Sequence, residues 1–104
     1  MPTREQLEKL LASEPDDVFL NFGLAMQLAK EDCKDAALAQ FRKVTEIDPD
    51  YSAGYYHQGR LLLGLGKAPE ARDVLRIGVQ ATQRTGDTHA ESEMQELLAE
   101  AESN

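Results

Sequence analysis

The feature that most constrains this chain is a pattern that returns after 34 residues. Five positions of the first copy, Leu24, Ala25, Leu28, Ala37 and Phe41, are followed at that distance by Gln58, Gly59, Leu62, Ala71 and Leu75. Pro15 is followed by Pro49 in the same way. A period of this length is typical of repeat proteins, in which short helical units stack and share one core. The sequence therefore predicts an architecture and a mode of action, and it does not identify a partner.

Length and charge narrow the classes of protein further. A chain of 104 residues forms one small domain that buries roughly 65% of its unfolded surface. The formal net charge of −8 disfavours nucleic acid and anionic membranes as partners, because binding to them depends on neutralising phosphate groups. The single cysteine, Cys33, fits a reducing compartment. No apolar run reaches the roughly 18 residues of a membrane span, and MPTREQLEK lacks a signal peptide's apolar segment, so we expect a cytoplasmic protein.

Helical spacing of apolar residues, together with prolines and capping residues, predicts the helices. They are expected at residues 3–13, 18–30, 34–47, 53–65, 69–84 and 88–102. Two capping-box patterns, Thr3-x-x-Gln6 and Thr88-x-x-Glu91, mark the first and last of these helices. Asp16 or Asp17 and Ser52 are candidate caps of the second and fourth. The fifth helix opens at Pro69 and is expected to end at Gly86.

Charge is unevenly distributed in the second half of the chain. Residues 85–104 contain six acidic residues and no Lys or Arg, whereas residues 51–84 have a net charge of +3. We therefore expect the last helix to dock on the preceding segment, with ion pairs that contribute only about 0–1 kcal/mol each where they are exposed.

The repeated pattern resembles the tetratricopeptide repeat family, whose signature is W-x2-L-G-x2-Y, then A-x3-F, then P. The first copy supplies Asn21-x2-Leu24-Ala25-x2-Leu28, Ala37-x3-Phe41 and Pro49, and the second supplies Tyr55-x2-Gln58-Gly59-x2-Leu62 and Ala71-x3-Leu75. Asn21, Gln58 and Gln83 depart from the signature. Small residues are expected where the paired helices cross, at Ala25, Gly59, Ala37 and Ala71.

The resemblance implies an all-α fold, a right-handed α-α superhelix of about five antiparallel helices in one domain, residues 1–104. It divides the chain into a half-repeat (3–15), a first repeat (18–51), a second repeat (52–85) and a capping helix (88–102). The chain also resembles small stand-alone bacterial proteins with two repeats and a cap.

In this family the first helix of each repeat lines a concave groove. The resemblance therefore implies the partner-binding candidates Phe19, Phe22, Met26, Tyr56, Arg60 and Leu63. Aromatic residues, Met and Arg are enriched in protein interfaces. Phe19, Phe22 and Met26 can instead be core residues under the first helix, and this alternative stays open. Some family members hold a C-terminal carboxylate in this groove, but Phe22, Met26 and His57 stand at those positions, so we do not expect that mode.

The sequence indicates no catalytic residue, metal site or cofactor. His57 and His89 are far apart and lack the neighbouring ligands of a metal site. Cys33 lies among acidic residues, which disfavour its thiolate. The glycines near Lys67 lack the spacing of a phosphate-binding loop.

We therefore expect a non-catalytic scaffold or adaptor that binds another protein or a peptide in the groove. The alternative is a structural subunit, whose apolar groove or capped end forms a homo-oligomer or a larger assembly.

Overall fold

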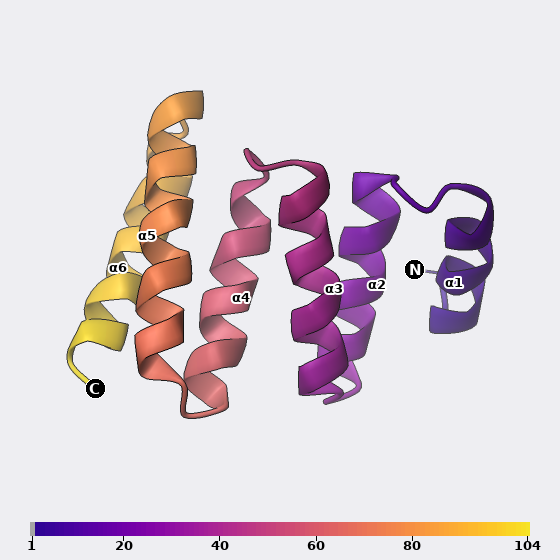
Figure 1. The fold of residues 1–104 in the computed structure, drawn as a ribbon, viewed down its shortest axis with the longest axis horizontal. Helices are drawn as coiled ribbons and strands as arrows, with labels where there is room; N and C mark the ends of the chain where they lie inside the picture. The colour runs from indigo at the N-terminus through magenta and orange to yellow at the C-terminus, as the bar shows by residue number, and fades with distance from the viewer. Residues whose placement is uncertain (1) are drawn as a thin grey trace.

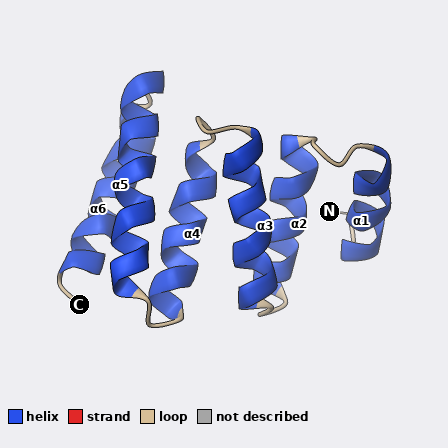
Figure 2. Cartoon of the chain, viewed as in Figure 1, coloured by secondary structure: helices blue, strands red, loops and turns tan. Residues whose placement is uncertain are grey.

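The computed structural model describes residues 2–104, and that part of the chain contains six helices. They are α1 (Arg4–Ser13), α2 (Val18–Lys30), α3 (Lys34–Ile47), α4 (Ser52–Gly64), α5 (Ala68–Thr85) and α6 (Thr88–Glu102). The prediction of an all-α fold is confirmed, and Figure 2 shows only helices and their connecting loops. The expected count of about five was one too low, because a half-repeat, two helix pairs and a cap add up to six.

The helices stand side by side in chain order, from α1 at one end of the molecule to α6 at the other (Figure 1). Each helix packs on the next, and α4 also contacts α6. Connected helices run in opposite directions, and the contact between α4 and α6 shows that these two helices lie next to each other, with α5 packed on both. The molecule measures 39 × 30 × 20 Å along its principal axes. None of the helices in residues 2–104 combines the length and the apolar character needed to cross a membrane.

Two of the predicted caps are formed as expected. Thr3 Oγ1 accepts a hydrogen bond from the Gln6 amide, and Gln6 Oε1 accepts one from the Thr3 amide, which completes the capping box of α1. Asp17, and not Asp16, caps α2, since its Oδ1 accepts a hydrogen bond of 2.9 Å from the Leu20 amide. These contacts satisfy amides that the first turn of a helix leaves without a partner.

Two other predicted caps were wrong by one position. Ser52 is the first residue of α4 rather than its cap, because the preceding turn already places the Tyr51 carbonyl to accept from the Gly54 amide. Thr88 is likewise the first residue of α6, and Asp87 caps that helix through a 3.0 Å hydrogen bond from the Ala90 amide. In both cases the helix incorporates the residue that the sequence pattern marked as its cap.

The turns inside the two predicted repeats have the same backbone conformation. Asp32, between α2 and α3, has a φ of 61°, and Gly66, 34 positions later between α4 and α5, has a φ of 76°. This left-handed conformation suits glycine and is tolerated by aspartate. Gly86, with a φ of 72°, ends α5 as predicted.

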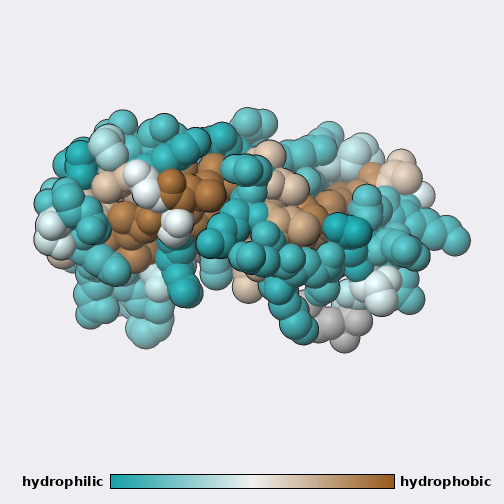
Figure 3. Space-filling view, turned by 90° about the horizontal axis from the view of Figure 1, so that it is seen from below, coloured by the Kyte–Doolittle hydropathy of each residue, from teal (hydrophilic) through white to brown (hydrophobic). Residues whose placement is uncertain are grey.

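The core consists of two clusters that meet at Leu61. The N-terminal cluster contains Leu7, Leu24, Ala25, Leu28, Ala37 and Phe41. The C-terminal cluster contains Leu38, Tyr55, Leu62, Ala71, Leu75, Ala81, Met94, Leu97 and Ala101. Leu61 packs against both. Seen from below, apolar side chains form two patches, one over each half of the stack, with hydrophilic side chains between and around them (Figure 3).

The last helix covers the end of the C-terminal cluster. Met94 and Ala101 of α6 are buried against α5, and Arg72 of α5 donates a 3.1 Å hydrogen bond to the Ala101 carbonyl. Arg76 forms an exposed ion pair of 3.4 Å with Glu102. The expected docking of this segment is therefore observed, and apolar burial outweighs the single exposed ion pair in energy.

Candidate partner-binding groove

Three adjoining depressions run across one face of the stack, and their lining comes from α2, α4 and α6, with Phe41 of α3 and Asp87 before α6. The first, of about 480 Å³ between α2 and α4, is lined by Met26, Ala29, Lys30, Phe41, His57, Arg60 and Leu61. The second, of about 360 Å³ between α4 and α6, is lined by Ser52, Ala53, Tyr56, His57, Asp87, His89, Ala90, Glu93 and Met94. The third, of about 600 Å³ between the same helices, is lined by Tyr56, Arg60, Leu63, Gly64, Leu97 and Glu100. We call these three depressions together the groove.

Helix α4 forms the middle of the groove. His57 is shared by the first and second depressions, Tyr56 by the second and third, and Arg60 by the first and third. One turn of α4 places Tyr56 and Arg60 next to each other, and the Arg60 guanidinium carbon lies 6.0 Å from the centre of the Tyr56 ring. A cation over an aromatic ring at this distance is weakly attracted by it. Both side chains can therefore contact the same ligand.

Aromatic rings gather where α2 meets α4. The centre of the Phe22 ring lies 5.7 Å from that of Phe41, 5.2 Å from that of Tyr51 and 5.7 Å from that of His57. The His57 ring stacks on Phe41 at 5.1 Å with an angle of 10° between the planes. Tyr56 packs edge-on against His57 at 5.5 Å. This cluster holds α4 against the first helix pair and builds the wall between the first two depressions.

The surroundings of His57 disfavour the protonated form of its ring. Burial is the main cause that lowers the pKa of His57, and the positive charge of Arg60 lowers it further. Its ring nitrogens make no hydrogen bond to residues 2–104 within 3.5 Å. A neutral imidazole offers one N–H donor and one acceptor nitrogen. His57 contributes both hydrogen-bonding groups to the wall of the groove.

The six sequence candidates lie in different surroundings. Met26 and Arg60 line the first depression, while Tyr56, Arg60 and Leu63 line the third. Phe22 and Phe19 line none of the three. Phe22 and Met26 are half-buried against the N-terminal cluster, as the core alternative expected, whereas Phe19 is 73% exposed and contacts Tyr51.

Sequence reasoning missed two members of the aromatic cluster, His57 and Tyr51. From the sequence, His57 was considered only as a metal ligand and at a carboxylate-binding position, although its place directly after Tyr56 on the same helix was a usable signal. Tyr51 precedes α4 and corresponds to Asp17 of the first copy, so the repeat gave no reason to expect an aromatic ring there. Its contact with Phe22 depends on how the two helix pairs stack.

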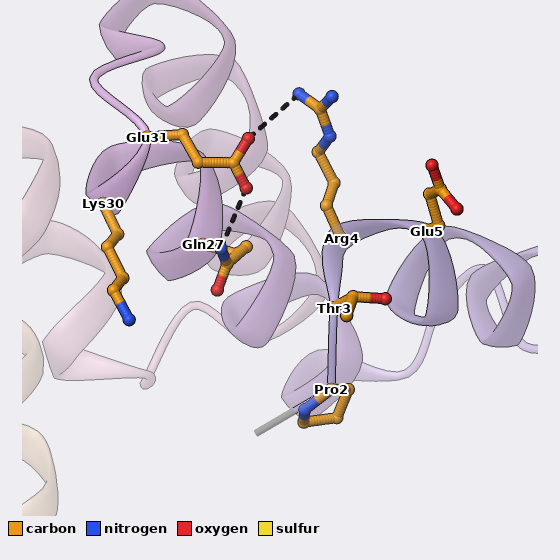
Figure 4. A pocket seen from close by; sticks show the side chains of 7 residues that line it. All are labelled: Pro2, Thr3, Arg4, Glu5, Gln27, Lys30 and Glu31. Carbon is orange, nitrogen blue, oxygen red and sulfur yellow. Dashed lines mark hydrogen bonds and ion pairs between the residues drawn. The ribbon is translucent and has the colours of Figure 1, made fainter.

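A further depression, of about 560 Å³, lies between the start of α1 and the end of α2. Its lining residues are Pro2, Thr3, Arg4, Glu5, Gln27, Lys30 and Glu31. Figure 4 shows Arg4 and Gln27 both reaching Glu31, with an ion pair of 3.4 Å and a hydrogen bond of 2.8 Å, while Lys30 points away from them. The carboxylate of Glu31, at the centre of this depression, is already paired within the chain. This depression therefore has fewer unpaired groups for a ligand than the groove has.

Within residues 2–104, no group of three or more His, Cys, Asp or Glu side chains is arranged to hold a metal ion. Cys33 is half-buried at the turn before α3, where its thiol lies 3.8 Å from the Glu31 carbonyl oxygen.

Comparison with known proteins identifies relatives of this chain. No protein-family model matches it. A TPR repeat-containing protein of Pseudomonas aeruginosa is 33% identical over 94 residues, which cover 90% of each chain. A tetratricopeptide repeat domain protein of Salinibacter ruber, solved by NMR, superposes with a TM-score of 0.80 at 35% identity, over 86% of this chain and 90% of the other. The TPR2B domain of yeast Sti1, solved in a complex with pHsp70, superposes with a TM-score of 0.89 at 18% identity, over 96% and 80%.

Proposed function

Since the chain belongs to the tetratricopeptide repeat family, we propose that it is a non-catalytic module that binds another protein in the groove between α2, α4 and α6. In this proposal residues 18–51 and 52–85 are the two repeats, residues 3–15 are a half-repeat, and residues 88–102 are the cap. The partner contributes an extended peptide or a helix, which are the two forms that grooves of this kind accept.

The observation that carries the proposal is the shared position of Tyr56 and Arg60 in the middle of the groove. Tyr and Arg are the residue types, with Trp, that contribute most to binding energy in protein interfaces. Tyr56 is half-buried and held by His57, so little conformational freedom is lost when a partner covers it. Arg60 is exposed and free to turn toward an acidic or carbonyl group of the partner.

A protein of similar structure supports the proposal that the partner is another protein. The yeast domain with a similar fold was solved with a bound partner, pHsp70. At 18% identity this likeness concerns the fold, and the residues of the present groove must select their own ligand. Two predicted repeats form a short groove, so we expect binding of a bare peptide with a Kd of roughly micromolar or weaker.

A selection from a random peptide display library tests the proposal. Wild-type protein should enrich a set of peptides from the library. A Tyr56→Ala/Arg60→Ala variant should enrich the same peptides at least tenfold less than the wild type does. A matched control is Ile77→Ala/Gln80→Ala, since both residues are exposed on α5, which lines none of the three depressions. Circular dichroism checks that all three proteins are folded. Equal enrichment by the wild type and the groove variant would contradict the proposal.

Self-association is the second candidate, because Phe19 is 73% exposed next to Tyr51 at the edge of the aromatic cluster. Light scattering coupled to size exclusion, at several concentrations, tests it. A wild-type dimer that Phe19→Ala dissociates would support self-association through this edge, and one that Tyr56→Ala/Arg60→Ala dissociates would place a second copy in the groove; either result would favour the structural role over peptide binding.

A further inference from the structure

The charged side chains of the groove are sorted by sign. The first depression, between α2 and α4, has two cations in its lining, Lys30 and Arg60, and no carboxylate. The second and third depressions, between α4 and α6, are lined by three carboxylates, Asp87, Glu93 and Glu100, all from α6 or its cap. Arg60 lies at the boundary, since it lines both the first and the third depression. Across the groove, Lys30 therefore lies at α2, Arg60 lies on α4 in the middle, and the carboxylates lie at α6, so the charge changes from positive to negative in the direction from α2 to α6.

The cations of the groove are not neutralised within the chain. Among residues 2–104, neither Lys30 nor Arg60 has a carboxylate oxygen within 4.0 Å. Elsewhere on the molecule Arg42, Arg76 and Arg84 each pair with a carboxylate, Arg84 with Asp50 at 2.8 Å. In a chain of net charge −8, two unpaired cations in one depression leave a local site for a negative group.

The carboxylates on the opposite side differ in what they already bind. Asp87 accepts the hydrogen bond that caps α6. Glu93 lies 3.2 Å from the ring of the exposed His89. Within residues 2–104, Glu100 has no cation within 4.0 Å of its carboxylate, although it lines the same depression as Arg60. Glu100 is thus the carboxylate without a cation among the described residues, and Glu93 shares its carboxylate only with the exposed ring of His89.

In the middle of the groove, apolar and aromatic side chains of α4 lie beside Arg60. Tyr56, His57 and Leu63 of α4 occupy this middle region. The axes of packed helices are about 8–10 Å apart. Helix α4 packs on α6, and α2 packs on α4 through α3, so the distance from α2 to α6 across α4 is at least roughly 20 Å. About six extended residues, at roughly 3.3 Å each, cover that distance.

We propose that the groove binds a peptide segment with opposite charges at its two ends. Its acidic end lies over Lys30 and Arg60, its apolar middle lies over Tyr56 and His57, and its basic end lies over Glu93 and Glu100. The inference rests on the proposed function, because it specifies the ligand of the same groove. A segment that lies in the opposite direction would place like charges together at both ends, so the charge pattern selects one orientation as well as one composition.

Four peptide libraries of equal length test the inference. Two have a random apolar middle with charged ends, one ordered acidic to basic and the other basic to acidic from the N-terminus. The third has the same composition with alternating charges, and the fourth is fully random. Enrichment on immobilised wild-type protein is measured by sequencing, at 0.15 M and at 1 M salt.

The expected result is that one of the two ordered libraries is enriched at least tenfold over the alternating library. This preference should be lost at 1 M salt, where the Debye length falls to about 3 Å. The variant Lys30→Glu/Arg60→Glu should lose it as well, and so should Glu93→Lys/Glu100→Lys. Combining all four substitutions reverses the charge pattern and should restore enrichment with the opposite ordered library.

The outcomes separate this inference from the proposed function. If the alternating and random libraries are enriched as strongly as the ordered ones, the charge-order inference is overturned and the groove still binds peptides. If no library is enriched over an immobilised Tyr56→Ala/Arg60→Ala control, peptide binding itself is overturned, and the inference falls with it.

Discussion

Asn21 and Tyr55 occupy the same position of successive repeats, 34 residues apart, and they make the same hydrogen bond. The Asn21 amide donates to the Pro15 carbonyl at 3.0 Å, and the Tyr55 hydroxyl donates to the Pro49 carbonyl at 2.8 Å. In both cases the acceptor lies six residues earlier, in the turn that leads into the helix. Two chemically different side chains therefore satisfy the same backbone group and fix the same turn.

Asn21 and Tyr55 differ in the other contacts that their side chains make. Tyr55 is long, and its ring is almost fully buried in the C-terminal cluster. The ring therefore adds apolar burial to the hydrogen bond that its hydroxyl makes. Asn21 is short and fully buried, and its side-chain oxygen accepts a hydrogen bond from Gln40 of α3. The equivalent of Gln40 in the second repeat is Val74, which is apolar. The comparison teaches that a polar residue at this position is tolerated only together with its polar partner.

Asn21→Leu should break this pairing and have the largest effect. The substitution leaves the Gln40 amide and the Pro15 carbonyl without their partner, which should cost about 3 kcal/mol in the free energy of unfolding. Urea unfolding followed by circular dichroism measures it. The double variant Asn21→Leu/Gln40→Leu should recover at least half of the loss, since it removes both polar groups. Strictly additive effects of the two substitutions would show that the pair is not coupled.

Gly59→Ala should show that close helix packing differs between the repeats. The equivalent residue in the first repeat is Ala25, whereas a Cβ on Gly59 would clash with Leu75 Cδ2 and Cγ, and Leu75 is fully buried. We expect a net loss of about 1–2 kcal/mol, despite the gain in helix propensity. Gly64→Ala is the matched control, because open space surrounds its Cβ position, and it should stabilise by up to about 1 kcal/mol. Stabilisation by both substitutions would contradict the expected clash.

Tyr55→Phe should have a smaller effect than Asn21→Leu. It removes only the hydroxyl, keeps the ring in the core, and should lower the free energy of unfolding by about 1 kcal/mol. The same urea measurement applies. A loss as large as that of Asn21→Leu would mean that the hydrogen bond to the proline carbonyl, and not the Gln40 pairing, dominates at this position.

The smallest expected effect is the contribution of His57 to the pH dependence of stability. The first repeat has no such contribution, because Gly23 is the residue equivalent to His57. Burial and Arg60 lower the pKa of His57 in the folded state, so the unfolded state binds more protons between the folded pKa and 6.5. Stability should therefore be at its full value above pH 6.5 and decrease as the pH falls through the folded pKa. Urea midpoints between pH 5 and pH 8 should show this decrease for wild type and a smaller one for His57→Phe. If the urea midpoints of the wild type and of His57→Phe change with pH in parallel, this prediction is wrong.

Much of the fold could be predicted because each repeat is specified by local contacts. Ala25, Ala37 and Phe41 are fully buried at the positions that the repeat pattern assigns to helix packing, and α3 has the predicted bounds of residues 34–47. The caps at Ser52 and Thr88 were wrong because backbone hydrogen bonds of the preceding turns decide where a helix starts. These bonds depend on φ and ψ, which a capping pattern reports only to within one or two residues.

The groove was less predictable than the core. Met26, Tyr56, Arg60 and Leu63 were candidates because the family's groove positions follow the repeat, and these four do line it. His57 was not a candidate, and Glu93 and Glu100 belong to the last helix, whose apolar pattern falls one residue late for a third repeat. Lining residues from three helices become neighbours only once the helices are stacked.

The sequence by itself determined the repeat and its helices, because periodic apolar residues, prolines and glycines act through contacts within one or two helices. Only the tertiary structure decided which surface the repeats present. The packing of Phe22 against Tyr51 and His57, and the positions of Lys30 and Arg60 relative to the carboxylates of α6, arise between residues 29 or more positions apart. Their distances are set by the rotation between successive helix pairs, and that rotation is a property of the packed core as a whole.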